Sequence, residues 1–375
     1  MKGKKRFALL IAVVMVLTMG LAACGGDSGS AAEPAGSTGG SSAAVSDDAP
    51  AASDITIAML PKFKGENYFD AVKVGAEEAA AELGIELLYD GPPQSDATNQ
   101  NQVNILEGWI AQGVDAILVS PNDPTAIAPT IEKAQAEGIK VITFDADADV
   151  RDLFINQASY DAIGTGMVKA VADKMEAKGY GPDNPINLGI VSSAKTDANQ
   201  AAWLEAIKAL IATDEYSWMK IANEDTDVYY PGPDETKTQQ DAGTLVSRMG
   251  TGADQIQAAI GLSSMATPAL AAQYESAAAK PDPTKVTMTG LATPNALKDY
   301  ILNDENPLDT GVLWNCMDLG YLSVQAAYQL ATGEITTDSP SMSAGRLGER
   351  EIADNTVLLG DALIFDKDNI DQFNY

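Results

Sequence analysis

The sequence contains no histidine, and among its 375 residues only Cys24 and Cys316 are cysteines. Without an imidazole ring, the Ser-His-Asp and Cys-His arrangements of nucleophilic catalysis are excluded, and so are metal sites with histidine ligands. Basic residues are also scarce: 24 Lys and Arg stand against 53 Asp and Glu, a formal net charge of −29. Because nucleic-acid binding depends on Lys and Arg contacts to phosphates, this balance argues against nucleic acid as a partner.

Motifs for phosphate binding and acyl transfer are absent as well. The sequence has no G-x-x-x-x-G-K-[ST], no G-x-G-x-x-G after a strand and no G-x-S-x-G, so nucleotide cofactors and a hydrolase serine find no support. We therefore expect no cofactor, no resident metal and no catalytic residue.

The first 23 residues have the pattern of an export signal. Four basic residues within positions 2–6 precede an uncharged apolar run over residues 7–19, and the segment ends in Leu21-Ala22-Ala23-Cys24. This ending resembles a bacterial lipobox, in which the peptide is cut before the cysteine and the cysteine sulfur receives a diacylglycerol. The alternative is a short transmembrane helix with an incidental cysteine, but residues 7–23 fall short of the ~20 apolar residues that a span needs.

The segment that follows, residues 25–53, is rich in Gly, Ser, Ala, Pro and Asp. Such a composition buries too little apolar surface to offset chain entropy. We interpret residues 1–23 as a lipoprotein signal peptide and residues 24–53 as a lipidated Cys24 with a disordered tether. The sequence thus predicts a protein anchored by lipid to the cell membrane, on its extracytoplasmic face. With Cys24 acylated, Cys316 has no partner for an internal disulfide.

From Asp54 onward, short apolar strands alternate with amphipathic helices, which is typical of βαβ units and parallel sheets. The expected strands cover residues 55–60, 85–89, 116–119, 141–144, 187–191, 258–261, 286–290 and 311–314. The expected helices cover residues 68–83, 98–112, 125–137, 162–177, 200–212, 236–248, 266–278, 295–302 and 319–330. After residue 330 the pattern is irregular, with short apolar runs at 357–359 and 363–365. One sheet with ordinary connections cannot hold this many strands and helices. We therefore predict an α/β fold with two doubly wound, Rossmann-like lobes.

Candidate functional residues follow from this fold, because ligands of doubly wound sheets bind at the carboxyl ends of the strands. The loops after the predicted strands carry aromatic rings, carboxylates and amides. This set suits a polyol, since carboxylates and amides bond to hydroxyls and ring faces stack on C–H surfaces. The candidate ligand-binding residues are Lys62, Asn67, Tyr68, Phe69, Asp145, Asp147, Asp197, Asn199, Ser263, Ser264, Trp314 and Asn315.

Several of these residues also have a structural interpretation. Asn67 could cap its helix, and Phe69 and Trp314 could belong to the core. Lys62 could lie in solvent, although a cation directly after a buried strand is seldom placed for packing alone.

Asp145 and Asp147 could instead form a calcium-binding or catalytic carboxylate pair. Alternate residues at a strand end usually point to opposite sides, which disfavours a shared site. An extracellular glycosidase would need two carboxylates about 5–10 Å apart across the bond that it cleaves. We expect that the protein is not an enzyme.

Runs of residues spread over positions 55–375 carry a family resemblance. They are 57–62 (IAMLPK) with 68–69 (YF), 89–92 (YDGP), 117–121 (ILVSP), 141–147 (VITFDAD), 155–157 (INQ), 313–315 (LWN), 318–321 (DLGY) and 364–367 (IFDK). The chain resembles a substrate-binding lipoprotein of an ABC importer, of the class with two α/β lobes joined by three crossing segments. More narrowly, it resembles the branch of rhamnose-binding proteins and autoinducer-2 receptors.

The resemblance implies a hinge near residues 156–159, 310–312 and 334–337. It divides the chain into an N-terminal lobe of residues 54–157 plus 312–335 and a C-terminal lobe of residues 158–311 plus 336–375. It also implies that Lys62 and Asp145 hold ligand oxygens from the first lobe and Asp197 from the second. The hinge would then close so that Asp197 and Ser264 complete the shell, and a monomer would deliver its ligand to the permease subunits.

Departures from the patterns of related receptors narrow the expected ligand. The autoinducer-2 pattern has glutamine where this chain has Ala198, Pro-Asp-Ala at residues 262–264, and aspartate at Asn315. The ribose-type pattern has arginine at Ala146 and another within residues 193–199, and neither is present. The remaining expectation is a small sugar, rhamnose-like or a related monosaccharide. The alternative is an autoinducer-2 receptor for uptake or signalling, because the fold serves both roles.

Overall fold

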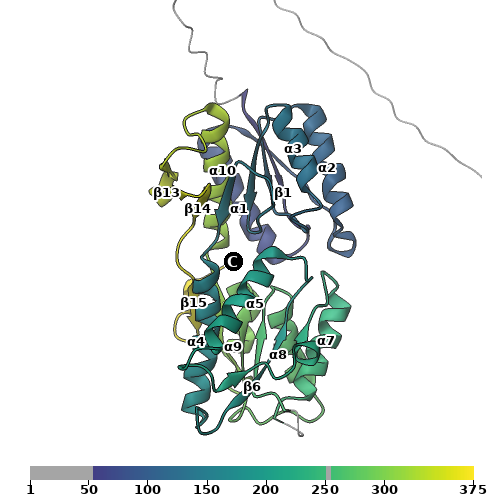
Figure 1. Cartoon of the computed structure of the whole chain (residues 1–375), viewed down its shortest axis with the longest axis vertical. Helices are drawn as coiled ribbons and strands as arrows, with labels where there is room; N and C mark the ends of the chain where they lie inside the picture. Colours follow the sequence, from purple (N-terminus) through teal and green to yellow (C-terminus); the bar gives the residue numbers. More distant parts are fainter. Residues whose placement is uncertain (1–53, 251–254) are drawn as a thin grey trace, which may run out of the picture. The chain divides into compact units, whose positions relative to one another are not determined.

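The computed structural model describes residues 54–250 and 255–375 (Figure 1). The signal peptide of residues 1–23 and the lipidated Cys24 with its tether lie outside the described residues. Among the helices of the described part, none has the length and apolar character of a membrane span.

The first of two sheets formed by the described residues has eight strands in the order β12-β13-β14-β5-β4-β3-β1-β2. The pairs from β14-β5 through to β1-β2 are parallel, whereas β12-β13 and β13-β14 are antiparallel. The strands are β1 (Thr56–Leu60), β2 (Glu86–Tyr89), β3 (Ala116–Val119), β4 (Lys140–Phe144), β5 (Leu153–Asn156), β12 (Ser341–Ser343), β13 (Glu349–Ala353) and β14 (Thr356–Leu358).

The second sheet has the order β15-β11-β10-β9-β6-β7, and β8 also pairs with β6. Its pairs are parallel except β11-β15, which is antiparallel. The strands are β6 (Ile186–Val191), β7 (Met219–Lys220), β8 (Val228–Tyr229), β9 (Ala258–Gly261), β10 (Thr287–Leu291), β11 (Leu308–Leu313) and β15 (Leu363–Asp366). The predicted α/β fold with two lobes is thus confirmed.

Helices connect most of the parallel strands (Figure 1). They are α1 (Asn67–Leu83), α2 (Asn99–Gln112), α3 (Ala128–Ala136), α4 (Tyr160–Ala177), α5 (Ala198–Ile211), α6 (Glu224–Asp227), α7 (Glu235–Ser247), α8 (Ala266–Ser276), α9 (Pro294–Ile301) and α10 (Cys316–Thr332). Left-handed glycines end α1, α2 and α10, at Gly84, Gly113 and Gly333. Helix α3 is shorter than predicted because Pro129 lacks an N–H and is tolerated only in the first turn.

Both faces of the first sheet are covered, and β1 shows how the sequence achieves this. Its residues alternate between two cores: Ile57 and Met59 face one, whereas Ala58 and Leu60 face the other. On the first face, α1 and α10 pack so closely that a Cβ added at Gly75 would lie 1.7 Å from the carbonyl oxygen of Met317. Glycine is therefore required at this crossing.

The C-terminal segment corrects the predicted division of the lobes. Sequence analysis assigned residues 336–375 to the C-terminal lobe, yet β12, β13 and β14 belong to the first sheet, where Val357 lies opposite Ile155 of β5. Only β15 of this segment joins the second sheet. The strands are short, and their place is decided by pairing with β5 and burial of Val357 rather than by any periodicity of their own.

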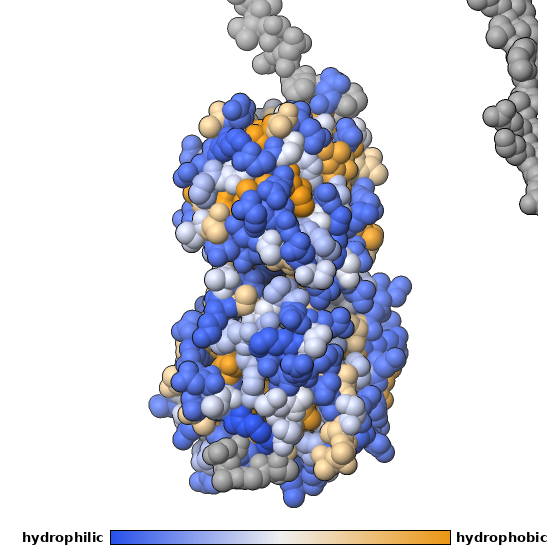
Figure 2. Space-filling view, turned by 90° about the vertical axis from the view of Figure 1, so that its right-hand side faces the viewer, coloured by the Kyte–Doolittle hydropathy of each residue, from blue (hydrophilic) through white to orange (hydrophobic). Residues whose placement is uncertain are grey.

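The surface in Figure 2 is largely hydrophilic, and its apolar spots are small and separated from one another. The large apolar side chains that are exposed, namely Val74, Leu302, Leu358 and Ile364, lie on different elements or at their ends. Scattered exposed apolar residues are normal for a folded protein and mark no docking face.

Candidate ligand cavity

A cavity of about 260 Å³ lies among the loops that follow the strands of both sheets. The described residues belong to one compact unit, and both lobes contribute to the cavity wall. Its volume is slightly below the range of about 300–1,000 Å³ that drug-sized ligands occupy. Nine of the predicted residues line it: Lys62, Tyr68, Phe69, Asp145, Asp197, Asn199, Ser263, Ser264 and Trp314.

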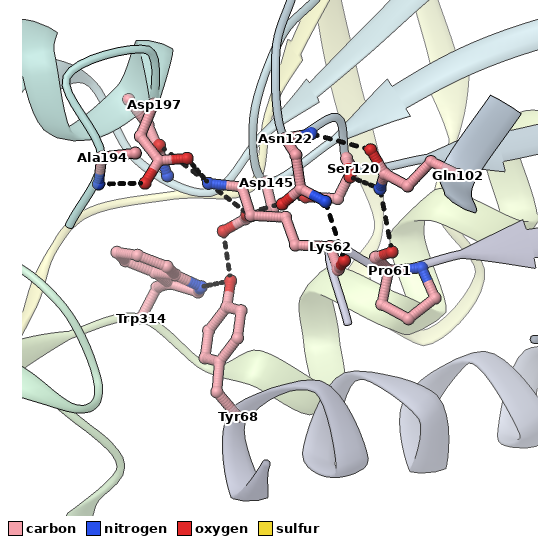
Figure 3. Close-up of polar contacts among 11 residues, drawn as sticks. Pro61, Lys62, Tyr68, Gln102, Ser120, Asn122, Asp145, Ala194, Asp197 and Trp314 are labelled. Carbon is pink, nitrogen blue, oxygen red and sulfur yellow. Dashed lines mark hydrogen bonds and ion pairs between the residues drawn. The ribbon is translucent and has the colours of Figure 1, made fainter. Parts of the chain in front are cut away.

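Lys62 extends from the end of β1 and contacts residues of both lobes (Figure 3). Its Nζ donates to Asp197 Oδ1 and to Asn199 Oδ1, each at 3.3 Å, and lies 3.9 Å from Asp145 Oδ2. The residue is only 6% exposed, so it does not lie in solvent. Burial by itself lowers the pKa of Lys62, but the carboxylates of Asp197 and Asp145 outweigh burial and raise that pKa. Lys62 is therefore a buried ammonium that two carboxylates share.

A polar network fixes the backbone that carries Lys62 (Figure 3). The side-chain amide of Gln102 donates to the carbonyl oxygens of Pro61 and Ser120, and its Oε1 accepts from the backbone N–H of Asn122. The Asn122 side chain in turn donates to the carbonyl oxygen of Lys62, at 3.0 Å. These bonds tie the loop after β1 to the loop after β3, so Lys62 enters the cavity from a rigid support.

Asp145 follows β4 and has a φ of 63°, in the left-handed region that aspartate tolerates better than most residues. Its Oδ1 accepts from the Tyr68 hydroxyl at 2.7 Å, and its Oδ2 accepts from the Ser120 hydroxyl at 2.9 Å. Burial raises the pKa of Asp145, against the opposing effects of Lys62 and of both hydroxyls.

Aromatic rings form another part of the wall. The indole N–H of Trp314, directly after β11, donates to the Tyr68 hydroxyl at 3.1 Å, which continues the chain of bonds to Asp145. The Tyr68 and Trp314 rings are perpendicular with centroids 5.8 Å apart, and Trp203 lies 5.8 Å from Trp314. Trp314 therefore lines the cavity and packs in the core at the same time.

The second lobe contributes residues from the ends of β6 and β9. Asp197 precedes α5 but its side chain does not cap that helix; Oδ2 accepts from the backbone N–H of Ala194 at 3.1 Å, which leaves Oδ1 for Lys62. Ser263 caps the start of α8, because its hydroxyl accepts from the backbone N–H of Ala266.

Three predicted residues do not line the cavity. Asn67 is exposed at the start of α1; Asp147 is bonded to Arg151 and Thr143; Asn315 caps α10 by accepting from the backbone N–H of Asp318. Asp147 and Asp145 thus have different partners and share no site. Within residues 54–250 and 255–375, no group of three or more acidic or cysteine residues is arranged to hold a metal ion.

Comparison with known proteins identifies the family. A family model described as a periplasmic binding protein domain matches residues 57–335. The chain belongs to the periplasmic binding protein family. This is a family of binding proteins, and the prediction that the chain is not an enzyme is confirmed.

Individual relatives of the periplasmic binding protein domain agree with this assignment. The ribose import binding protein RbsB of Bacillus subtilis is 32% identical over 125 residues, which are 32% of this chain and 39% of that protein. The chain spans about two fifths of the length of the curated relatives that it matches.

Two solved structures cover more of the chain. A sugar ABC transporter from Actinomyces odontolyticus is 29% identical with a TM-score of 0.66, covering 86% of this chain and 98% of that one. LsrB from Clostridium saccharobutylicum in complex with AI-2 is 25% identical with a TM-score of 0.77, covering 86% of this chain and all of that one.

Sequence reasoning missed several residues of the binding-protein cavity, among them Glu66, Gln200 and Trp203. Glu66 stands four residues after Lys62 in the same loop, and Ser264 of the second lobe approaches its carboxylate closely enough to favour the charged form. Burial raises the pKa of Glu66 to about 7. A charged residue next to a glycine looks like ordinary loop surface, so only the approach of Ser264 shows that it faces the cavity.

Proposed function

We propose that the protein is the extracytoplasmic solute-binding component of an ABC importer, and that it captures a monosaccharide-sized sugar between its two lobes and delivers it to a permease. The observation that carries this proposal is the contact of the Lys62 ammonium with Asp145 of the first lobe and with Asp197 and Asn199 of the second. A residue that bonds to both lobes is well placed to couple ligand capture to closure.

The make-up of the cavity wall supports a hydroxylated ligand. Carboxylates and amides can accept from sugar hydroxyls, the Lys62 ammonium can donate to them, and the Trp314 and Phe69 rings offer faces for C–H surfaces. A volume of about 260 Å³ favours one sugar ring over an oligosaccharide.

Capture follows from this arrangement. The ligand first bonds to Lys62 and Asp145 in the first lobe, and hinge closure then brings Asp197 and Ser264 against it. Closure excludes water, which strengthens each hydrogen bond in the cavity and allows tight binding without any chemical step. The closed form is the one that the permease subunits recognise.

A rhamnose-like sugar or a related monosaccharide is the first candidate ligand. The second is AI-2, which the LsrB structure contains. Of the three departures from the autoinducer-2 pattern, Ala198 and Asn315 do not line the cavity, and only the one at residues 262–264 does. The departures therefore weigh less against AI-2 than the sequence suggests.

The position in the cell follows from the N-terminal segment. We propose that a lipid on Cys24 holds the protein, as a monomer, at the extracytoplasmic face of the cell membrane. Mass spectrometry of the protein from membranes tests this: a diacylglycerol on Cys24 supports the anchor, and an unmodified Cys24 preceded by intact residues 1–23 contradicts it.

Thermal melts test the ligand class. The purified protein is melted with millimolar L-rhamnose, L-fucose, ribose, xylose, glucose, galactose or synthetic AI-2. A ligand with micromolar affinity stabilises the native state by about 4 kcal/mol at that concentration, several degrees in Tm. A shift with one or a few sugars supports the proposal, a shift with AI-2 alone selects the second candidate, and no shift with any of them contradicts both.

A further inference from the structure

A second contact between the lobes lies at the rim of the cavity, apart from Lys62. The side-chain amide of Gln94 donates to the thioether sulfur of Met265 at 2.7 Å. Gln94 begins η2 (Gln94–Asp96), a turn of 3-10 helix that follows β2 in the first lobe, whereas Met265 directly precedes α8 in the second. Both side chains line a groove that adjoins the cavity, and Met265 lines the cavity as well. The contact therefore crosses the boundary along which the lobes meet.

The sulfur of Met265 is also accessible, which is unusual in this protein. Of the nine methionines within residues 54–250 and 255–375, seven are at most 2% exposed: Met59, Met167, Met175, Met219, Met249, Met288 and Met342. The other two, Met265 and Met317, are half-buried. A buried thioether meets an oxidant in solvent only through local unfolding, whereas a half-buried one can be attacked in the folded state. Met317 lies on α10 outside the cavity and the groove, so it provides a matched control.

The loop of Gln94 is tied to the loop that carries Lys62. The backbone N–H of Lys64 donates to the carbonyl oxygen of Pro92 at 2.9 Å, and Lys64 forms a β-bridge with Pro93, the residue before Gln94. Lys62 stands two residues before Lys64. The contact with Met265 therefore holds the same pair of loops from which Lys62 reaches the second lobe.

We propose that Met265 is a site of oxidative modification, and that conversion of its thioether to the sulfoxide weakens the contact between the lobes and lowers the affinity for sugar. The effect on sugar rests on the proposed function, whereas the modification and its effect on the lobe contact do not. The oxidant is a peroxide. One oxygen atom of hydrogen peroxide forms a bond to Sδ, the O–O bond breaks, and the other oxygen leaves as water; the sulfur is oxidised by two electrons and the peroxide is reduced by two.

Neither possible position of the new oxygen suits the contact with Gln94. An oxygen on the side of Gln94 has to lie between two atoms that are 2.7 Å apart, so the Gln94 loop must move away from Met265. An oxygen on the opposite side withdraws electron density from the sulfur, and the amide of Gln94 then faces a poor acceptor. Sulfoxide formation turns a flexible apolar side chain into a polar one and disrupts interfaces built on methionine.

Peptide mass spectrometry of the purified full-length protein, treated with millimolar hydrogen peroxide, tests the site of modification. We expect Met265 and Met317 to be oxidised more than about tenfold faster than the seven buried methionines, because those react only through local unfolding. A protein in which Met317 is oxidised while Met265 remains a thioether overturns the proposal.

Hydrogen–deuterium exchange tests the effect on the lobe contact and needs no ligand. After oxidation, we expect exchange in residues 93–98 and 263–267 to be about fivefold faster, the equivalent of one lost hydrogen bond. In Met265→Leu, which removes the sulfur, peroxide should leave both segments unchanged, whereas in Met317→Leu the response should persist. In Gln94→Ala the contact is already absent, so oxidation should add little. Exchange that is unchanged or slower after oxidation, or that responds equally in Met265→Leu, overturns the proposal.

Calorimetry tests the effect on binding, with the sugar that raises Tm most as the probe. We expect the oxidised wild-type protein to bind this sugar about fivefold more weakly, and Met265→Leu to bind it equally before and after peroxide treatment. Equal affinities of the wild-type protein before and after oxidation overturn this part of the proposal. If none of the sugars binds, the proposed function fails, and the exchange measurement still decides whether oxidation of Met265 weakens the lobe contact.

Discussion

Lys62 Nζ lies 3.3 Å from Asp197 Oδ1, although 135 positions separate the two residues in the sequence. Lys62 follows the first strand of one sheet and Asp197 follows the first strand of the other, so this bond joins the carboxyl-terminal edges of both sheets. In the proposed mechanism, ligand capture and closure of the lobes therefore depend on the same pair.

Replacing Lys62 by methionine is expected to destabilise the folded protein. The change leaves Asp145 and Asp197 buried without a cation, and removing one partner of a buried ion pair costs about 3–5 kcal/mol. Urea unfolding at pH 7 measures the loss. Lys64→Met, at a largely exposed ion pair with Asp90, is the control and should cost less than about 1 kcal/mol. Equal losses in both variants would show that Lys62 has no special role.

The pH dependence of stability should carry the signature of Glu66. Its pKa is raised from 4.5 to about 7, so the folded state holds a proton that the unfolded state has already lost between these values. Stability is therefore lost as the pH rises through this window, and the cost is fully present above pH 7. Because the side chain is partly exposed, we expect a loss of about 2 kcal/mol relative to Glu66→Gln between pH 4.5 and 8. Parallel unfolding curves for the two proteins across this window would contradict the assignment.

Tyr68→Phe tests the two hydrogen bonds that link Trp314 to Asp145 through the Tyr68 hydroxyl. The variant keeps the ring but loses a hydroxyl that donates to Asp145 and accepts from Trp314. With the sugar that raises Tm most, we expect affinity to fall by about tenfold, since Asp145 is left with an unpaired lone pair. Calorimetry measures the change, and Tyr180→Phe, outside the cavity wall, should leave affinity as it is. Undiminished affinity in Tyr68→Phe would show that these hydrogen bonds do not contribute to ligand binding.

Gly75→Ala tests the crossing of α1 and α10, which supports the loop of Lys62 and Glu66. The added methyl group meets the carbonyl of Met317, so we expect a loss of about 3 kcal/mol or failure to fold. Gly108→Ala in α2, where the methyl group meets nothing within 4 Å, should be neutral or stabilising by up to about 1 kcal/mol. Thermal melts of both variants make the comparison; a Gly75→Ala protein as stable as the wild type would contradict the packing.

Long periodic elements could be predicted from the sequence, whereas short strands could not. β3 and β9 have the predicted bounds, and α1 and α2 each begin one residue away from the predicted start. Bounds could be predicted because each element has a continuous apolar pattern and because α1 and α2 end at a glycine. β5, β7, β8, β12 and β13 escaped prediction, since their two to five residues contain no period and form strands only by pairing.

The same distinction applies to the candidate site. Lys62, Asp145, Asp197 and Ser264 follow strands, so topology alone places them at the cavity. Trp203 and Gln200 lie within a helix and Glu66 in an exposed-looking loop, and their role depends on which helix face turns inward and how the lobes meet. Asn315 follows a strand as well, yet it caps α10 instead.

The location of a bound sugar tests the central claim most directly. A crystal structure of the protein with the sugar that raises Tm most should place that sugar within hydrogen-bond distance of Lys62, Asp145 and Asp197, beside the Trp314 ring. A sugar bound elsewhere, with the Lys62 to Asp197 contact intact and the cavity filled by water, would contradict the account.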